Sequence, residues 1–486
     1  MRKKFFSVLM AVFLFFSYFP MLKVDASMEK RAVWISYLDF QKYLQNKNEA
    51  DFTAMFENMC KKSVDQGLNT LIVHVRAFND AVYPSENYPW AEWLTTSKTD
   101  PGYDPLQIMI DLAHKYNLKF EAWLNPYRIA LKTAQSTSFM SSPYVQQYTP
   151  NDLILYEAAG EQRMILNPAS DLAIENIVEG IEEIVRNYDV DGIHFDDYFY
   201  QTGTDEGTSP QSRKDAVNKL ISKVYSTIKS IDEEIVFGIS PQGNLDNCRG
   251  HGADIDTWLS KDGYVDYVMP QLYWTDEYGS QGNIKMFSNR ANEYKKIWTN
   301  KNVDLQVGLA LYRANTHSAS DLGWSNRQDN LAAQVKIAEG LGYNGYALFR
   351  FEHLLQAKTQ EELANLKKIN SSTNEEKPDS KPDENLPMNP NLDTSKPGWQ
   401  EVDGTWYFVE DDGSLKTRWL AGNKGVNDWY WLNHGIMQTN YWVPTDKGWY
   451  YMDGNGNMAY DVTLSTSDGR YGSFDATFDS DGIWIK

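Results

Sequence analysis

Eight short segments rich in β-branched and aromatic residues recur along the first 370 residues, and amphipathic patterns separate them. The patterns at 51–67, 104–117 and 169–188 place apolar residues at the three- and four-residue spacing of a helix. Eight strand–helix units in about 330 residues predict an α/β fold, a (β/α)8 TIM barrel. A doubly wound open sheet is the alternative, but no Gly-rich phosphate-binding turn follows the first segment. The expected strands lie within 31–40, 69–78, 119–127, 192–200, 234–242, 264–274, 303–312 and 345–354.

The N-terminus has the pattern of a secretory signal peptide over residues 1–26. A basic start precedes an apolar run, and a small-residue site ends at Ala26. A retained membrane anchor is the alternative, but the run is short for a membrane span and Ser17 and Pro20 interrupt it. We therefore expect a secreted, extracellular protein without membrane contact after cleavage.

Composition divides the remaining chain. Residues 370–397 contain almost no apolar side chains and many Pro, Asp, Glu, Ser and Asn residues, so they are predicted to form a disordered linker. The linker separates a barrel domain at 27–369 from a tail at 398–486.

Charge and cysteine content narrow the possible partners. The net charge of −20 argues against nucleic acid or an anionic membrane surface as a partner. The two cysteines, Cys60 and Cys248, lie far apart in the sequence and are expected to be reduced structural residues rather than a disulfide.

The tail repeats a short aromatic pattern. Segments 404–417, 427–439 and 447–460 each contain Trp-Tyr and a third aromatic residue, then a polar turn and a short apolar strand. The leading Trp residues are 23 and 20 residues apart, a spacing that predicts a small all-β solenoid of stacked hairpins. The pattern resembles the cell-wall-binding (choline-binding) repeats of secreted proteins from Gram-positive bacteria.

That resemblance implies aromatic cages between neighbouring hairpins that hold a quaternary ammonium group by cation–π attraction. The implied partner is choline-bearing teichoic acid, and the implied location is the cell wall of a Gram-positive bacterium. Alternatively, the aromatic residues only join the hairpins, or the repeats bind glucans. The residues implied to bind are Trp406, Tyr407, Trp429, Tyr430, Trp449 and Tyr450.

The stretch "DGIHFDDYFY" at 191–200 places two adjacent carboxylates at the end of an apolar and aromatic segment. Side chains alternate between the two faces of a barrel strand, and the face toward the helices must be apolar. His194, Asp196 and Tyr198 are therefore expected to point inward. Asp196 then lies at the C-terminal mouth of the barrel, where such barrels carry their active sites, and Asp197 lies at its rim.

The same alternation brings polar and aromatic side chains of other strands to the mouth, a mixture suited to sugars. Glu121 also points inward but lies deep in its strand, so it is expected to pair with Arg76 or His74. The remaining residues expected at the mouth are His74, Arg76, Trp123, Asn125, Ser240, Gln242, Met269, Gln271, Tyr273, Trp274, Tyr312, Arg350 and Glu352.

Seven motifs over about residues 30–365 resemble, in order, the glycosyl-hydrolase-like 10 family of secreted bacterial barrels. They are "RAVWISYLDF", "WLNPYR", "ILNPAS", "DGIHFDDYF", "SPQG", "MPQLYW" and "GYALFRFE". The resemblance implies a glycosidase that acts on bacterial cell-wall glycan, in some members on peptidoglycan strands without stem peptides. The functional residues that it carries over are Asp196, Asp197, Asn125, Gln271 and Tyr273.

Glycoside hydrolysis needs two carboxyl groups, one of them a general acid. Asp196 occupies the inward position of the nucleophilic Asp in the α-amylase group. Chitinase-like barrels are a second comparison, but Tyr198 stands where their catalytic Glu would be. We take Asp196 as one catalytic carboxylate and Asp197 or Glu352 as the other.

No Cys or His cluster has metal-ligand spacing, and no Ser elbow or cofactor motif is present, so neither metal nor cofactor is expected. Two other functions remain open. One is a hydrolase of a dietary or capsular polysaccharide, and the other is a non-catalytic glycan-binding surface protein. The discriminating feature is whether two carboxyl groups face each other across the mouth within roughly 5 to 10 Å.

Overall fold

The computed structural model describes residues 28–374 except 205–206, and residues 391–485 except 403, 417, 423–428, 434, 446–447 and 468–472. The predicted signal peptide at 1–26 lies outside the described residues. The chain forms two compact units, Met1–Lys367 and Lys368–Lys486. The helix Gln360–Asn374 begins in the first unit and ends in the second, so it extends into the segment predicted as linker. Most of the rest of that segment lies outside the described residues.

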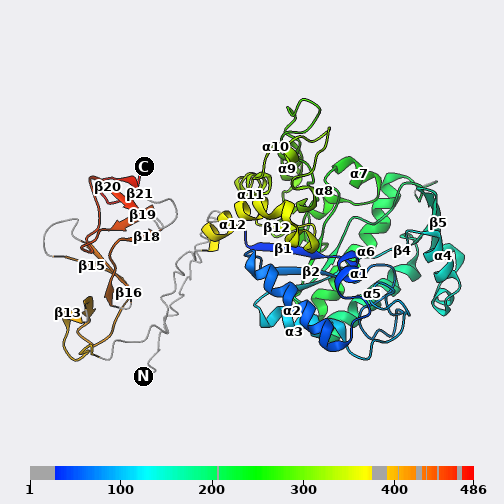
Figure 1. The fold of residues 1–486 in the computed structure, drawn as a ribbon, viewed down its shortest axis with the longest axis horizontal. Helices are drawn as coiled ribbons and strands as arrows, with labels where there is room; N and C mark the ends of the chain where they lie inside the picture. Colours follow the sequence, from blue (N-terminus) through cyan, green and yellow to red (C-terminus); the bar gives the residue numbers. More distant parts are fainter. Residues whose placement is uncertain are drawn as a thin grey trace, which may run out of the picture. The chain divides into compact units, whose positions relative to one another are not determined.

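The first unit is built around one parallel sheet with the strand order β10-β9-β8-β7-β3-β2-β1-β12-β11 (Figure 1). Neighbours in this order pair in parallel throughout, which confirms the predicted barrel. The strands are β1 Lys30–Ile35, β2 Thr70–Arg76, β3 Lys119–Leu124, β7 Gly192–Phe195, β8 Val236–Ile239, β9 Tyr267–Val268, β10 Asp304–Leu305, β11 Val307–Leu309 and β12 Gly345–Leu348.

The sheet has nine strands rather than the predicted eight because the seventh strand is interrupted. Gln306 separates β10 from β11 and donates its backbone N–H to the Val268 carbonyl. β10 pairs with β9 while β11 pairs with β12, so the two pieces together join the two sides of the barrel.

Helices surround the barrel, with α2 packed on α3 and α5 on α6 (Figure 1). The helices are α1 Tyr37–Tyr43, α2 Glu49–Asp65, α3 Pro105–Lys115, α4 Thr133–Met140, α5 Asp171–Asn187, α6 Pro210–Ile231, α7 Leu245–Gly250, α8 Ile255–Trp258, α9 Met286–Ile297, α10 Gly323–Asn326, α11 Asn330–Gly340 and α12 Gln360–Asn374. Short 3-10 helices are η1 Pro143–Gln147, η2 Pro150–Asp152, η3 Leu311–Arg313, η4 Phe351–Leu355 and η5 Ala357–Thr359.

Local sequence explains where several of these helices begin. The Asp104 side chain accepts hydrogen bonds from two backbone N–H groups at the start of α3, and Pro105 occupies the first helical position. Ser209 caps α6 in the same way, with Pro210 next. A capping oxygen satisfies N–H groups that have no partner within the helix, while Pro lacks the N–H that would need one.

An insertion that the strand pattern did not predict follows β3. It contains the three-stranded sheet β4-β6-β5, with β4 Arg128–Ala130, β5 Leu153–Ala158 and β6 Glu161–Leu166, together with α4. Because this insertion follows the carboxyl end of a barrel strand, it lies beside the mouth.

The barrel interior carries a buried charged pair at the opposite end from the mouth. Nζ of Lys30 lies 2.5 Å from Oε1 of Glu121, and the Tyr267 hydroxyl donates to Oε2 of Glu121 at 2.6 Å. The predicted pairing of Glu121 with Arg76 or His74 is therefore wrong. Lys30 has the inward parity of Trp34, but it precedes the segment in which a strand was predicted.

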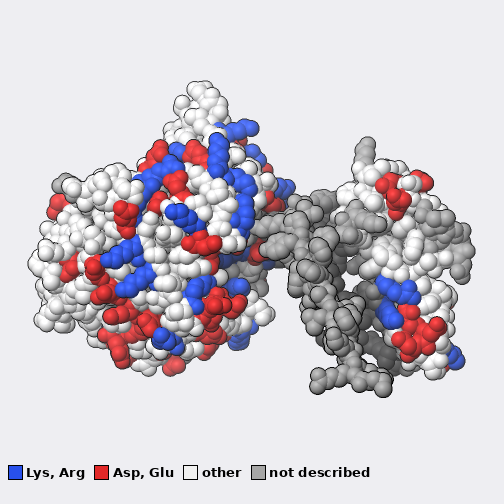
Figure 2. Space-filling view, turned by 180° about the vertical axis from the view of Figure 1, so that it is seen from behind, with Lys and Arg blue, Asp and Glu red and all other residues white. Residues whose placement is uncertain are grey.

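Cys60 and Cys248 are buried free thiols, as predicted. On the face shown in Figure 2, acidic and basic side chains are interspersed over the barrel. Among the described residues, no helix has both the length and the apolar character needed to span a membrane.

The second unit consists of antiparallel β-hairpins, which confirms the all-β character of the tail. One five-stranded sheet has the order β13-β14-β17-β16-β15, and β18-β19 and β20-β21 form separate pairs. The strands are β13 Gly398–Val402, β14 Thr405–Val409, β15 Arg418–Ala421, β16 Trp429–Asn433, β17 Ile436–Met437, β18 Tyr441–Thr445, β19 Gly448–Met452, β20 Val462–Ser467 and β21 Ser473–Phe478.

Candidate active site

A cavity of about 310 Å³ opens at the carboxyl ends of the barrel strands. Its lining contains both adjacent carboxylates of the "FDDY" motif and a set of aromatic rings. We call it the mouth cavity. It is lined by Trp34, Ser36, Tyr37, Leu38, His74, Trp123, Arg128, Asp196, Asp197, Tyr198, Ser240, Gln271, Tyr273 and Phe349.

Asp196 is the more buried of the two carboxylates, with 4% of its surface exposed. Its Oδ2 accepts a hydrogen bond from Nδ2 of Asn125 at 2.6 Å, and its Oδ1 accepts one from the backbone N–H of Tyr198 at 3.0 Å. Burial raises the pKa of Asp196 to about 7; the nearby Arg128 opposes this rise, and the negative charge of Asp197 adds to it.

Asp197 follows directly and is half-buried. Burial raises the pKa of Asp197 as well, while hydrogen bonds that include those of Gln242 and Gln271 lower it. Nε2 of Gln271 lies 3.5 Å from Oδ1 of Asp197. Two neighbouring carboxyl groups that both resist ionisation titrate as a pair, so the last proton leaves the pair at a higher pH than it would leave an isolated Asp.

Arg128 is the main site residue that sequence reasoning missed. It stands in the "WLNPYR" motif, but it lies beyond the end of β3, where alternation along a strand no longer predicts direction. Its Nε donates to the Ala77 carbonyl at 2.8 Å, and its guanidinium lies 4.7 Å from the Tyr198 ring centre. Its Nη2 is buried and has no hydrogen-bond partner among the described residues.

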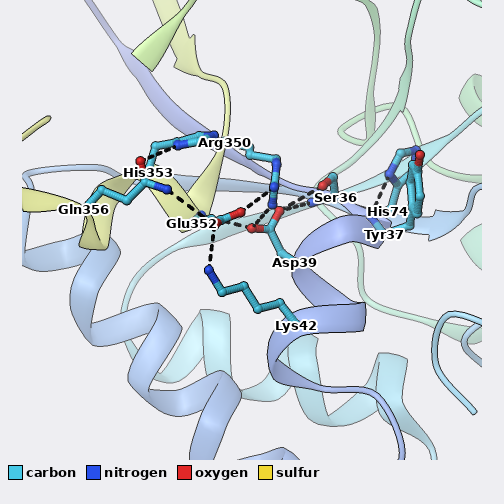
Figure 3. Close-up of polar contacts among 9 residues, drawn as sticks. All are labelled: Ser36, Tyr37, Asp39, Lys42, His74, Arg350, Glu352, His353 and Gln356. Atoms are coloured by element: carbon cyan, nitrogen blue, oxygen red, sulfur yellow. Dashed lines mark hydrogen bonds and ion pairs between the residues drawn. The ribbon is translucent and has the colours of Figure 1, made fainter. Parts of the chain in front are cut away.

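A hydrogen-bond chain orients the amide that touches Asp196. The backbone N–H of Tyr37 donates to Nδ1 of His74 at 3.2 Å, so Nδ1 carries no proton (Figure 3). Nε2 of His74 then donates to Oδ1 of Asn125 at 2.5 Å, which leaves the Asn125 NH2 group to donate to Asp196. Burial, with Arg128 acting in the same direction, lowers the pKa of His74 well below its usual value, so the ring stays neutral.

A second chain crosses the barrel axis. Because the Tyr267 hydroxyl donates to Glu121, its oxygen accepts from Nδ1 of His194 at 2.6 Å. Nε2 of His194 therefore accepts, from Nε1 of Trp34 at 3.2 Å and from the Ser240 hydroxyl at 2.9 Å. Burial lowers the pKa of His194 well below its usual value. Ser240 accordingly presents an acceptor oxygen to the mouth cavity.

Glu352, the alternative second carboxylate, does not line the mouth cavity. Figure 3 shows it in a charged cluster with Asp39, Lys42 and Arg350. Lys42 lies 2.6 Å from Oε1 of Glu352, and Nη1 of Arg350 lies 2.6 Å from Oδ1 of Asp39. The hydrogen bond from Lys42 lowers the pKa of Glu352, a direction opposite to the one a general acid needs.

This cluster has a structural consequence for the mouth. Asp39 and Lys42 belong to α1, whereas Arg350 and Glu352 follow β12. The ion pairs therefore hold α1 against the end of the barrel. Because Tyr37 is the first residue of α1, the cluster fixes one wall of the mouth cavity.

The other predicted residues divide into two groups. Trp123, Tyr198, Gln271 and Tyr273 line the mouth cavity, and Asn125 and His194 lie behind its wall. Besides Asn125, His194 and Glu352, six residues predicted at the mouth do not line this cavity: Arg76, Gln242, Met269, Trp274, Tyr312 and Arg350.

Structural roles account for several members of that second group. Arg76 is buried and donates to the carbonyls of Asn125 and Pro126 at 2.9 Å each, because β2 departs from regular register between His74 and Arg76. Met269 belongs to the apolar core of the barrel. Tyr312 packs its ring against that of Tyr273.

Several residues that line the mouth cavity were not predicted. Ser36, Tyr37 and Leu38 come after β1, and Phe349 comes after β12. Trp34 lies on β1 and has the inward parity, which Ser36 and Leu38 share, so alternation along the predicted strand at 31–40 could have found these three residues.

The tail arranges its aromatic rings in a repeating contact. Trp399 packs against Tyr430 of the next hairpin at a centroid distance of 5.3 Å, and Trp419 packs against Tyr450 at 5.3 Å. Trp399 and Trp419 were not among the predicted binding residues. Of those, Trp406 and Trp449 are exposed, Trp429, Tyr430 and Tyr450 are partly exposed, and Tyr407 is buried.

No group of three or more His, Cys, Asp or Glu side chains in the described part of the chain is arranged to hold a metal ion. The mouth cavity instead contains a carboxylate pair, one buried guanidinium and several rings. This set can protonate or stabilise a bound molecule and stack on its apolar faces.

Comparison with known proteins gives matches along the barrel. The family described as Glycosyl hydrolase-like 10 matches residues 29–326. The glycosyl hydrolase YngK of Bacillus subtilis (strain 168) is 32% identical over 365 residues, covering 66% of this chain and 68% of YngK. The glycosyl hydrolase DigH of Escherichia coli (strain K12) is 29% identical over 345 residues, covering 62% of this chain and 76% of DigH.

One solved structure matches a short part of the chain. The choline-binding domain of Spr1274 from Streptococcus pneumoniae is 32% identical, covering 19% of this chain and 96% of that chain, with a TM-score of 0.15. So low a score leaves the choline-binding repeats a prediction.

Proposed function

The chain belongs to the glycosyl hydrolase-like 10 family and is a glycosidase, and we propose that its substrate is bacterial cell-wall glycan. The observation that carries the proposal is the adjacent carboxylate pair in a cavity lined by rings and hydrogen-bonding side chains. Ring faces match the apolar faces of sugars, while Ser240, Gln271 and Arg128 can bind hydroxyl or acyl oxygens. The predicted signal peptide and the predicted wall-binding tail favour a wall polymer over other glycans.

The carboxylate pair can supply both functions that glycoside hydrolysis needs. Asp196, the more buried member, carries the shared proton near neutral pH and donates it to the leaving oxygen. Asp197 is then ionised and stabilises, or attacks, the positively charged sugar carbon that develops as the bond breaks.

Asn125 and His74 act behind this pair. Because His74 fixes the Asn125 amide with its NH2 group toward Asp196, the carboxyl group is held in one orientation. Arg128 lowers the pKa of both carboxyl groups, which keeps the Asp196 pKa within reach of neutral pH despite its burial.

The decisive experiment is digestion of purified glycan strands with and without stem peptides, followed by identification of the products by mass spectrometry. We expect cleavage products from at least one of these polymers, and none from the same preparation with Asp196→Asn. If the enzyme cleaves a capsular or dietary polysaccharide but neither form of the cell-wall glycan, the proposed substrate is wrong and the glycosidase activity is still supported.

The tail would retain the enzyme at the cell wall of a Gram-positive bacterium. Its support is the ring contact between neighbouring hairpins, in which Trp399 meets Tyr430 and Trp419 meets Tyr450. Rings that converge in this way can hold a quaternary ammonium group such as the choline of teichoic acid. The test is retention of the full chain on a choline matrix and its elution by free choline.

A further inference from the structure

A second cavity of about 410 Å³ opens beside the mouth cavity. Its walls are α1, the loop between β2 and α3, and the insertion after β3, with α4 and η1. We call it the side cavity. All of these elements follow the carboxyl ends of β1, β2 and β3, so the side cavity lies on the same end of the barrel as the carboxylate pair.

The two cavities share a wall. Tyr37 and Leu38 line both of them. The Tyr37 ring packs edge-on against Phe78 of the side cavity at a centroid distance of 4.9 Å, and the Arg128 guanidinium of the mouth cavity lies 4.5 Å from the centre of the Phe78 ring. The two cavities therefore adjoin at Tyr37 and Leu38.

The side cavity offers rings and neutral polar groups. Trp90, Phe139 and Tyr144 line it and are partly exposed, so part of each ring remains uncovered. Gln41 and Gln135 add amide groups to the lining.

Most charged side chains of the side cavity are matched within the protein. Lys98 lies 2.9 Å from Glu92, and Asp80 accepts hydrogen bonds from the backbone N–H of Phe78 and from Nε1 of Trp93. Lys132 also lines it and is exposed. With two lysines and two acids, the lining has no formal charge excess. An uncharged ligand with apolar faces and hydroxyl groups fits such a site, and sugars have both.

We propose that the side cavity binds further sugar residues of the same glycan chain whose scissile bond lies at Asp196 and Asp197. This inference rests on the proposed function and adds to it a requirement for chain length on one side of the bond. Each cavity is near the lower end of the roughly 300–1,000 Å³ range of small-ligand sites, so a chain of several sugars needs both. Trp90 is the specificity-determining residue of the side cavity.

The test compares Trp90→Ala with wild type on cell-wall oligosaccharides of increasing length. We expect kcat/KM of the wild type to rise with length. Trp90→Ala should lower kcat/KM for the long oligosaccharides about tenfold, through KM, and leave the shortest cleaved oligosaccharide unchanged. Phe139→Ala, in α4, should act in the same direction. Tyr264→Ala is the matched control, because Tyr264 precedes β9 at the far end of the barrel and lines neither cavity.

Titration calorimetry with the same oligosaccharides separates this inference from the proposed catalysis. Length-dependent binding that Trp90→Ala weakens, without cleavage by the wild type, would remove the glycosidase assignment to this substrate and leave the side cavity as a sugar site. A kcat/KM independent of length, or an equal loss at every length in Trp90→Ala and Phe139→Ala, would overturn the inference. Absence of binding at any length would overturn both.

Discussion

The replacement Asp196→Asn distinguishes two possible roles of the buried carboxyl group, general acid and nucleophile. Asn keeps the shape and still accepts a hydrogen bond from the Tyr198 N–H, but it cannot donate a proton to a leaving oxygen. General acid catalysis contributes about 10²- to 10⁴-fold to a rate. We therefore expect turnover of the glycan to fall by about that factor.

An activated substrate makes the test specific. In an aryl glycoside made from a strongly acidic phenol, the phenolate leaves without being protonated. Asp196→Asn should therefore cleave this substrate within about tenfold of the wild-type rate. Initial rates on the glycan and on the aryl glycoside are the two measurements. Equal losses on both substrates would refute the assignment of Asp196 as the acid and favour a nucleophilic role for it.

The pH dependence follows from the same assignment. Asp196 has a pKa raised to about 7, so it is protonated below that pH and loses its proton above it. The wild-type rate on the glycan should therefore fall as the pH rises through about 7. A rate that stays constant from pH 6 to pH 9 would show that no group with this pKa acts as the acid.

Stability provides a control on folding. Raising the pKa of a buried carboxyl group from 3.8 to about 7 corresponds to roughly 4 kcal/mol of destabilisation at a pH above both values. Asn removes that penalty but weakens hydrogen bonds to a charged group, each worth about 1.5–3 kcal/mol. The two effects nearly cancel, so the melting temperature at pH 8 should move by only a few degrees. A large decrease would mean that lost activity reflects unfolding.

Three further predictions concern the second carboxylate, the barrel interior and the tail. Asp197→Asn should abolish glycan cleavage, whereas Glu352→Gln should reduce it less than about tenfold. If the two variants lose kcat to a similar extent, Glu352 is a catalytic carboxylate. Glu121→Gln removes the buried carboxylate that pairs with half-buried Lys30 and should lower the free energy of unfolding in urea by up to about 3–5 kcal/mol. An unchanged midpoint and slope of the urea transition would contradict a tight pair. Trp429→Ala should elute from a choline matrix at a lower choline concentration than the wild type, because it loses one cation–π contact worth roughly 1–2 kcal/mol of binding free energy. A wild-type chain that does not bind the matrix would exclude choline as the ligand.

Much of the barrel and part of its site could be predicted because the relevant signals are local. The alternation of strands and helices depends on residues a few positions apart, and it placed all eight barrel segments. Within one strand, alternation placed His194 and Asp196 inward, as their contacts with Trp34 and Asn125 confirm. The signal ends with the strand, which is why Arg128 was missed.

The Glu352 cluster shows why partners of charged residues were harder to predict. Alternation along the last strand placed Glu352 toward the mouth, but Lys42, 310 residues earlier in the chain, holds its carboxylate instead. Glu121 likewise pairs with Lys30 from the first strand rather than with a residue of its neighbour β2. Pairing of this kind depends on which side chains the closed barrel brings within a few ångströms of one another.

The sequence by itself determined the strand–helix order, the two adjacent aspartates at the end of a strand and the aromatic period of the tail, because each is a pattern of neighbouring residues along one chain direction. Only the tertiary structure decided that Asn125 and Arg128 flank Asp196, that Glu352 secures α1, and that a side cavity adjoins the mouth. These features arise where loops from separate strands meet, and the distance between such loops in space is set by closure of the barrel rather than by their separation in sequence.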